Sequence, residues 1–509
     1  MITVWTVTRR LSIPLRPTQF ANWPDKCRDA PIQRSPGKQL PESNCRKANA
    51  RKQMMVQTTD TIYALATPPG RSALAVIRIS GDFALQVPGL FGLPAAGGRD
   101  MRYARLQDRQ GAPLDEVLLL SFAGPRSATG EDVLEIHCHG SPAVLAGITA
   151  ILADCEDLRA AEPGEFSRRT LLNGKKDITE IEGLADLIEA ETDLQRVQAL
   201  RQMQGALSLP AADWRARILS LLSQLEALID FADEELPPEL AEQLDQQAGQ
   251  LVGELTAALA GAGTGELVRQ GVQLVLIGPA NAGKSTTLNA LAGRAAAIVS
   301  DEAGTTRDIV ELRLDLRGVP VRIADTAGWR QAGDQVEAEG IRRARQAASE
   351  ADFLLIVLDA SAAGWPDQLA DLQGWGQAEK LVLLNKADQA TEADKARITA
   401  HFEGSDQDWI LLSMQQEGAA AQLERQLADR LIPQNISAAD TLITRQRHAA
   451  ALAEARAALM AGQTHQLASA PELRAEQYRR AADALGRLAG KLDVEELLDQ
   501  IFSRFCIGK

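Results

Sequence analysis

The feature that most constrains the fold is a phosphate-binding loop set between a buried strand and a helix. The apolar run Val272–Ile277 precedes the eight residues Gly-Pro-Ala-Asn-Ala-Gly-Lys-Ser, and a helical stretch follows at Thr286–Leu291. This is the GxxxxGK[ST] spacing in its strand–loop–helix context, where glycines let backbone N–H groups approach phosphates. We expect Lys284 to reach the β- and γ-phosphates and the Ser285 hydroxyl to bind Mg²⁺. A chance Gly-rich loop is the alternative, and the intact context disfavours it.

Two further motifs follow in the order that a guanine-nucleotide site requires. Asp325-Thr326-Ala327-Gly328 follows the apolar run Val321–Ile323, and Asn385-Lys386-Ala387-Asp388 follows the run Leu381–Leu384. We expect Asp325 to hold Mg²⁺ through water and the Gly328 N–H to contact the γ-phosphate. The Asp388 carboxylate can accept hydrogen bonds from guanine N1–H and the 2-amino group, which adenine lacks in that arrangement. An unpaired buried acceptor costs about 1–3 kcal/mol, so this carboxylate is predicted to select GTP over ATP.

The loops beside these motifs supply further candidates. Residues 301–308 read Asp-Glu-Ala-Gly-Thr-Thr-Arg-Asp and lie where a switch loop belongs, and Thr306 is our choice for a second Mg²⁺-binding hydroxyl. Ser413 follows the strand-like run Ile410–Leu412, although Met414 stands where an alanine is usual. Trp329 follows the Asp-Thr-Ala-Gly motif, where Ras-like enzymes place a water-orienting glutamine. An indole cannot orient the attacking water, so another group must do so, or hydrolysis is slow.

The order of strand-like and helical segments predicts three domains. A chain of 509 residues normally divides into several domains. We expect an α+β domain at 54–175, a helical domain at 176–270 and 435–509, and between the two helical parts a parallel α/β domain at 271–434. Strand-like runs are expected in the first domain at 62–66, 73–79, 117–122 and 133–137, and helices in the last part at 449–460 and 472–502.

Composition limits the remaining possibilities. The net charge of −14 argues against a protein that coats nucleic acid through a broad positive field. Five scattered cysteines without a CxxC pair argue against a disulfide framework or a structural zinc site, and favour a cytoplasmic protein. No apolar run is long enough to span a membrane. Residues 1–53 are Arg-rich and acid-poor; we expect an extension without a fixed fold or an incorrectly assigned start, with a transit peptide as the alternative.

Together these motifs resemble the MnmE (TrmE) family of tRNA modification GTPases from about Met55 to the last residue. The resemblance includes the P-loop with Asn281, the Gly-Thr-Thr-Arg-Asp loop, and the C-terminal Cys-Ile-Gly-Lys at 506–509. It also includes Ala-Thr-Pro-Pro-Gly-Arg at 66–71, Thr-Gly-Glu-Asp at 129–132 and Pro-Gly-Glu-Phe-Ser at 163–167. The tail and the N-terminal segments are far more specific than the general GTPase motifs.

The resemblance implies a K⁺-dependent GTPase that is activated when two G domains of a homodimer meet. By match to the family, K⁺ would be bound by Asn281, Ser300, Glu302 and Thr305, and Glu337 would orient the water with Lys284 and Thr306 as the other catalytic residues. Trp329 and Glu302 depart from the usual family residues, but a backbone carbonyl acts at position 302. The predicted GTP-binding residues are Asn281, Ala282, Gly283, Lys284, Ser285, Thr286, Ser300, Thr305, Thr306, Asp325, Thr326, Ala327, Gly328, Asn385, Lys386, Asp388 and Ser413.

The resemblance also implies a 5-formyltetrahydrofolate-type cofactor in the N-terminal domain. Arg78, Glu135, Lys175 and Lys509 would form that site, since Arg and Lys suit the glutamate tail and Glu135 suits the donor edge of the pterin. Cys506 is either a reactive thiol or a small residue packed in a helical tail. The family modifies C5 of the wobble uridine (position 34) of certain tRNAs to an aminomethyl-type derivative, with a flavin-containing partner in a heterotetramer.

Several alternatives remain open at this point. A regulatory GTPase, such as a ribosome-assembly factor, would share the nucleotide motifs but would not need the N-terminal domain or the Cys-Ile-Gly-Lys tail. A binding scaffold with a degenerate G domain is disfavoured by the intact Lys284, Ser285, Thr306 and Asp325. His137-Cys138-His139 invites a metal-binding interpretation, but no further ligands lie nearby in the sequence, so a packed strand end is favoured.

Overall fold

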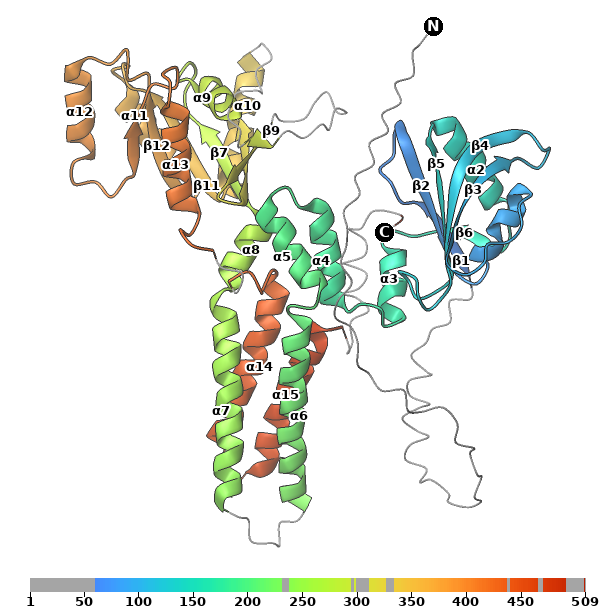
Figure 1. Ribbon diagram of the computed structural model, residues 1–509. Coiled ribbons are helices and arrows are strands. Elements are labelled where there is room, and N and C mark those ends of the chain that lie inside the picture. The colour runs from blue at the N-terminus through green and yellow to red at the C-terminus, as the bar shows by residue number, and fades with distance from the viewer. Residues whose placement is uncertain are drawn as a thin grey trace, which may run out of the picture. The chain divides into compact units, whose positions relative to one another are not determined.

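The computed structural model describes residues 60–230, 238–293, 297–298, 311–325, 334–436, 440–465, 470–490 and 508. These residues form the α+β, helical and α/β parts that the sequence predicts, and each is described separately below (Figure 1). Residues 1–53, whose nature the sequence left open, lie outside the described part. Within that part, no helix combines the length and the apolar character needed to cross a bilayer.

The N-terminal part is a six-stranded sheet with the order β3-β4-β5-β2-β1-β6, in which only β1 and β6 pair in parallel. Its strands are β1 Thr61–Leu65, β2 Ser72–Ser80, β3 Asp100–Gln107, β4 Pro113–Phe122, β5 Val133–Gly140 and β6 Leu158–Ala160. One face packs against the 3-10 helix η1 (Ala84–Phe91) and α2 (Pro142–Ala153) in a shared apolar core. On the other face, Phe166 of α3 (Glu165–Leu172) packs against β1.

The helical part is assembled from both ends of the inserted α/β domain. Its helices are α4 Ile178–Glu189, α5 Asp193–Met203, α6 Ser208–Asp230, α7 Pro238–Ala260, α8 Ala262–Gln270, α14 Gln446–Thr464 and α15 Pro471–Leu488. Helices α6, α7, α14 and α15 lie side by side around one apolar core (Figure 1). Because α14 and α15 follow the α/β domain in the chain, the predicted discontinuous helical domain is confirmed.

The α/β part is a seven-stranded sheet with the order β13-β12-β11-β7-β10-β9-β8. Its strands are β7 Val272–Ile277, β8 Ala297–Ile298, β9 Glu311–Leu316, β10 Val319–Asp325, β11 Phe353–Asp359, β12 Glu379–Asn385 and β13 Trp409–Leu411. Helices α9 (Lys284–Ala292) and α13 (Ala419–Leu431) cover one face, and α10 (Asp334–Glu350), α11 (Trp365–Gln373) and α12 (Glu392–Phe402) cover the other. Strands β7, β10, β11, β12 and β13 pair in parallel, so their carboxyl ends lie at the same edge of the sheet.

Two sequence expectations require correction. The sheet is not wholly parallel, because β9 runs antiparallel to β10 and β8 runs antiparallel to β9. The two residues Arg317-Gly318 between β9 and β10 allow a hairpin but are too few for a parallel crossover. The predicted helix 472–502 is interrupted: α15 ends at Leu488, and Gly490 adopts φ +72, a left-handed conformation typical of the residue after a helix end. The rest of the predicted helix, residues 491–502, lies outside the described part.

Candidate nucleotide site

The P-loop begins and ends at glycines that other residues could not replace. A Cβ on Gly278 would lie 2.1 Å from the carbonyl oxygen of Val357 on the neighbouring strand. Gly283 caps α9 with φ +100, and a Cβ there would lie 2.1 Å from Nδ2 of Asn385. The loop is therefore closely packed against β11 and against the loop after β12, and its backbone leads directly into the N-terminus of α9.

The P-loop lysine lies inside the loop that it serves. Lys284 is 8% exposed, and its Nζ donates hydrogen bonds to the carbonyls of Gly278 at 2.7 Å and Pro279 at 2.8 Å. The ammonium is thus held at the mouth of the loop beside the first turn of α9. Ser285 and Thr286 follow in that turn and are exposed. Asn281, also exposed, adopts φ +63 at the turn of the loop.

Asn385 joins three of the predicted motifs. Its side chain is 2% exposed; Nδ2 donates to the carbonyl of Ala282 at 3.0 Å, and Oδ1 accepts from the backbone N–H of Met414 at 3.0 Å. The loop after β12 is tied to β13 by a further bond from Ala387 N to Leu412 O at 3.1 Å. The P-loop, the Asn-Lys-Ala-Asp motif and the Ser413-Met414 loop are therefore brought together, as the sequence predicts.

A carboxylate that sequence reasoning missed supports this loop. Lys386, with φ +61, donates from Nζ to Asp359 at the end of β11 over 2.7 Å. Burial by itself raises the pKa of Asp359, but hydrogen bonds from Lys386 and Ser361 outweigh it and the pKa lies below its ordinary value. The sequence did carry a signal for Asp359, because this aspartate ends the otherwise apolar strand β11, which pairs with β7. Asp388 follows Lys386 in the same loop, and it is exposed.

Other predicted nucleotide-site residues lie outside the described part of the chain. These are Ser300, Glu302, Thr305, Thr306, Thr326, Ala327 and Gly328. Asp325 ends β10 and Glu337 lies in α10, so the backbone of each is placed although its side chain is not described. The proposed K⁺ ligands and catalytic groups therefore stay predictions, apart from the positions of Asn281 and Lys284.

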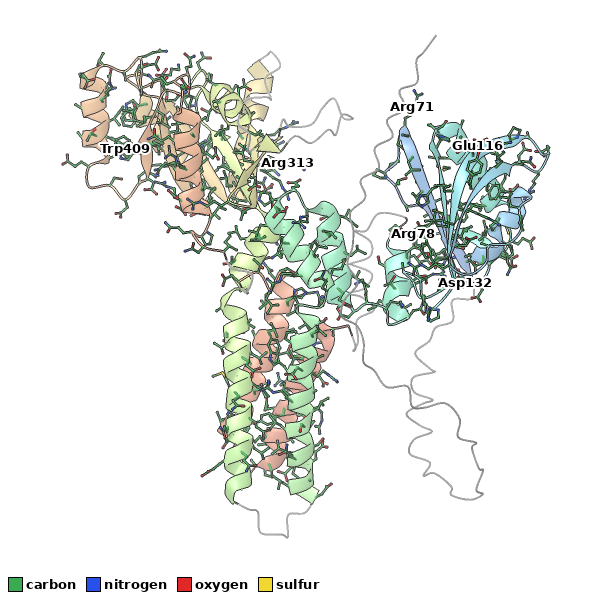
Figure 2. The ribbon with its side chains drawn as sticks, in the orientation of Figure 1. Arg71, Arg78, Glu116, Asp132, Arg313 and Trp409 are labelled. Carbon is green, nitrogen blue, oxygen red and sulfur yellow. The ribbon has the colours of Figure 1, made fainter. Side chains whose placement is uncertain are left out.

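The N-terminal sheet brings together two of the predicted cofactor residues. Arg78 of β2 lies opposite Glu135 of β5, and its Nε donates to Oε1 at 2.9 Å (Arg78 is labelled in Figure 2). A second bond runs from Arg78 Nη1 to the carbonyl of Gly508 at 3.3 Å. A Cβ on Gly508 would lie 2.2 Å from the carbonyl oxygen of Leu65, so only glycine fits there. The residue before Lys509 thus reaches the sheet, while Cys506 and Lys509 themselves lie outside the described residues.

Lys175 lies on the next loop rather than in contact with this pair. Its Nζ donates to the carbonyl of Pro125 at 2.8 Å, and its aliphatic chain lies within 3.3 Å of where a Cβ on Gly130 would be. Burial by itself raises the pKa of Glu135, but a hydrogen bond with His137 and the charge of Arg78 lower it below its ordinary value. Glu135 is therefore an ionised acceptor near neutral pH.

A buried arginine explains two of the N-terminal motifs. Arg169 is 2% exposed and pairs with Asp60 at 2.9 Å, Glu165 at 3.0 Å and Glu131 at 3.1 Å. These contacts link α3, the start of β1 and the Thr-Gly-Glu-Asp segment. The glutamates of that segment and of Pro-Gly-Glu-Phe-Ser thus hold the sheet edge together, and α3 presents Phe166 to the guanidinium of Arg78 at 5.9 Å.

The two histidines of β5 bind separate carboxylates. His137 Nε2 lies 3.1 Å from Glu135 Oε2, and His139 Nδ1 lies 2.7 Å from Asp115 Oδ1. Among the described residues, no group of three or more potential ligands could hold a metal ion. Cys138 points to the opposite, buried face, where burial raises the pKa of its thiol to about 11. Cys138 and Gly140 are buried at this strand end, whereas the His139 side chain is exposed, so the predicted packed strand end holds only in part.

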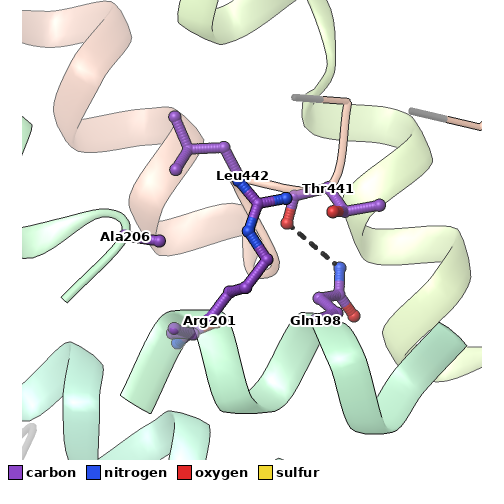
Figure 3. A pocket seen from close by; sticks show the side chains of 6 residues that line it. Gln198, Arg201, Ala206, Thr441 and Leu442 are labelled. Carbon is purple, nitrogen blue, oxygen red and sulfur yellow. Dashed lines mark hydrogen bonds between the residues drawn. The ribbon is translucent and has the colours of Figure 1, made fainter. Parts of the chain in front are cut away.

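A small polar pocket lies where the chain enters and leaves the α/β domain. It is lined by Gln198, Arg201, Gln202, Ala206, Thr441 and Leu442 (Figure 3). Gln198 Nε2 donates to the carbonyls of Gly265 at 2.8 Å and Thr441 at 3.2 Å, which join the two connecting segments. The pocket is part of a structural junction and not of the nucleotide site.

Together, the strand–loop–helix cradle and the three loops joined by Asn385 define a P-loop guanine-nucleotide-binding protein. Two family models match the chain: the MnmE helical domain over residues 178–506 and the GTP-binding protein TrmE N-terminus over residues 61–175. The chain therefore belongs to the tRNA modification GTPase MnmE family.

Relatives with that name cover nearly the whole chain. The chain is 45% identical over 459 residues to the tRNA modification GTPase MnmE of Parvibaculum lavamentivorans, covering 88% of this chain and all of the relative. It is 44% identical to the tRNA modification GTPase MnmE of Rhodopseudomonas palustris strain BisB18, and this match covers 88% of this chain and 99% of the relative. Among solved structures, Aquifex aeolicus Era Y63A bound to GDP·AlF4− is 22% identical to this chain, with a TM-score of 0.26. The match covers 37% of this chain and 67% of the Era chain.

Proposed function

We propose that this chain hydrolyses GTP to drive the modification of a tRNA, at C5 of the wobble uridine (position 34). The observation that carries the nucleotide part is the side chain of Asn385, which joins the P-loop to the two base-recognition loops. The relatives' shared name, tRNA modification GTPase, supports the tRNA part because the similarity extends over all three domains. The product we propose is an aminomethyl-type derivative.

The proposed cations follow from the residues around the P-loop. A Mg²⁺ ion would be bound by the Ser285 hydroxyl at the start of α9 and by Thr306, and it would neutralise phosphate charge. We propose that K⁺ is bound by Asn281 together with Ser300, Thr305 and the backbone of residue 302. Asn281 fits such a role because it is exposed at the turn of the loop and its amide oxygen is a suitable ligand for a cation.

The proposed cofactor site is built from Arg78, Glu135, Lys175 and Lys509. The described members suit a reduced folate: the ionised Glu135, paired with Arg78, suits the N–H donors of a pterin, and the cation of Lys175 suits the glutamate tail. When bound, this cofactor would supply a one-carbon unit. We further propose a homodimer whose G domains meet during hydrolysis, and a flavin-containing partner that completes the modification reaction.

Replacing Asp388 tests guanine recognition directly. In Asp388→Asn, the amide presents a donor where guanine also donates, so GTP affinity should fall about 100-fold while xanthosine triphosphate affinity rises. Affinities for both nucleotides are measured by titration with fluorescent analogues. Asp367→Asn, an exposed carboxylate in the first turn of α11, is the control and should leave both unchanged. Unchanged GTP affinity in Asp388→Asn would rule out the proposed base contact.

Potassium dependence needs its own measurement. With Na⁺ in place of K⁺, the hydrolysis rate should fall more than tenfold while GTP affinity changes little, because the proposed cation acts on charge that develops during the reaction. Equal rates in the two salts at matched ionic strength would rule out a role for K⁺ in hydrolysis. The proposed guanine-binding site would be unaffected by that result.

A further inference from the structure

One histidine beside the proposed cofactor site has no role in the function proposed above. His137 follows Glu135 by two residues on β5, so both side chains project from the same face of the sheet. Its cross-strand neighbours are Val76 on β2 and Leu118 on β4. The imidazole is 22% exposed and the Glu135 side chain 17% exposed. A polar ring between two apolar neighbours has the carboxylate as its partner.

Both oxygens of Glu135 are held, each by a different residue. Oε1 accepts from Arg78 Nε at 2.9 Å, and Oε2 lies 3.1 Å from Nε2 of His137. Since the pKa of Glu135 is lowered, the carboxylate is ionised and can only accept, so the histidine must donate from Nε2. Two contacts, one on each oxygen, fix the plane of the carboxylate, which a single contact would leave free to rotate.

A carboxylate has about four lone-pair directions. With Arg78 and His137 each using one, two remain, one on each oxygen. Two parallel N–H donors, such as the N3–H and 2-amino group of a reduced pterin, match that remaining pair. The orientation of Glu135 therefore decides whether the bidentate contact can form.

We propose that His137 is a positioning residue, which fixes Glu135 in the orientation that accepts the paired N–H donors of a reduced-folate ligand. This rests on the proposed cofactor site. His137 acts through Glu135 and need not touch the ligand itself.

The test uses the full chain with 5-formyltetrahydrofolate as the probe and compares two amide replacements. His137→Gln keeps a donor at the reach of Nε2 and should bind within threefold of the unchanged protein. His137→Asn is equally polar but too short to reach Oε2, and its affinity should fall about tenfold, the loss expected for one charge-assisted hydrogen bond. His139→Asn is the matched control on the same strand, with its own partner Asp115, and should bind normally.

A double-replacement cycle shows whether His137 acts through Glu135. Once Glu135→Gln has removed the carboxylate, adding His137→Asn should weaken binding less than twofold, because the carboxylate that His137 orients is already absent. GTP hydrolysis should be unchanged in the His139→Asn control, and circular dichroism confirms that each variant is folded. Equal affinity of the Gln and Asn variants, or additive losses in the cycle, would overturn the positioning role while leaving the folate site standing. Absence of binding by the unchanged protein would overturn both.

Discussion

Gly283 is the residue at which the nucleotide site is most sensitive to a small change. It combines φ +100 with a Cβ position 2.1 Å from Asn385 Nδ2. Alanine there would strain the backbone by about 1–3 kcal/mol and push away the side chain that joins the three loops. We expect Gly283→Ala to weaken GTP binding about 100-fold, as measured by nucleotide titration.

The glycine at the other end of α9 provides the control for this prediction. Gly293 follows α9 with φ −71, and a Cβ there would have its nearest neighbour at 3.4 Å. Gly293→Ala should bind GTP normally. If both replacements bind equally well, the close approach of Gly283 to Asn385 does not matter for nucleotide binding.

Buried charges in the helical domain predict a dependence of stability on pH. Glu182 accepts two hydrogen bonds from Arg447 and one from His448 Nε2 at 2.8 Å. His448 is fully buried, and its Nδ1 has no partner among the described residues. Burial lowers the pKa of His448 despite the contact with Glu182, and the neighbouring Arg445 and Arg447 lower it further.

The sign of the effect follows from these shifts. The unfolded chain takes up a proton at His448 near pH 6.5, whereas the lowered pKa delays this uptake to lower pH in the folded chain, so stability falls as the pH drops below that value. Glu182, whose pKa is also lowered, adds a loss below about pH 4.5. Between pH 7.5 and 5.5 we expect His448 to lower the free energy of unfolding as the pH falls, seen as a lower urea midpoint. His448→Gln, which keeps the donor to Glu182 without titrating, should flatten this part of the curve; an equally steep curve would contradict the assignment.

At the scale of elements, α5 joins the helical domain to the G domain. Gln195, Gln198 and Gln202 lie on one buried face of this helix. Gln195 and Gln198 donate to backbone carbonyls of the entering and leaving segments. Gln202 donates to the carbonyl of Thr179 in α4 and accepts from the hydroxyl of Thr444. At its N-terminus, Thr192 donates to the carbonyl of Gly318 at 2.6 Å, and Glu191 pairs with Arg313 (labelled in Figure 2). The β9–β10 hairpin is thus anchored at the end opposite the proposed switch loops.

Removing one of these glutamines should loosen the junction. Gln198→Leu removes the hydrogen bonds from the Gln198 amide to the carbonyls of Gly265 and Thr441, and each such bond contributes about 0.5–1.5 kcal/mol to stability. We expect the first thermal transition to fall by several degrees. Gln204→Leu, at the exposed C-cap of the same helix, should cause little change. Equal melting curves for the two variants would mean that the backbone carbonyls find other partners.

Local signals predicted where the P-loop and the Asn-Lys-Ala-Asp motif lie in the fold, because each motif follows its own strand. The P-loop strand Val272–Ile277 matches β7 residue for residue, and Asn385 joins the loops that its motif implied. The contacts of α5 could not be predicted, since they join residues such as Gln198 and Thr441 that are 243 positions apart. His137 carried a visible signal, its spacing of two from Glu135, but the identity of its partner required the structure.

At the scale of the whole molecule, one discontinuous helical domain connects the N-terminal domain to the G domain along the chain. The same chain therefore links GTP hydrolysis to a proposed one-carbon site. A regulatory GTPase would need GTP hydrolysis but would not need a one-carbon site. The decisive evidence must therefore come from the tRNA product and from its dependence on the nucleotide pocket.

The most direct measurement is mass spectrometry of tRNA nucleosides from a strain that lacks this gene. The account predicts that aminomethyl-type wobble uridines disappear, return with the unchanged gene, and fail to return with Lys284→Ala at equal protein levels. Full modification in the deletion strain, or full rescue by Lys284→Ala, would contradict the claim that GTP hydrolysis by this chain drives the modification.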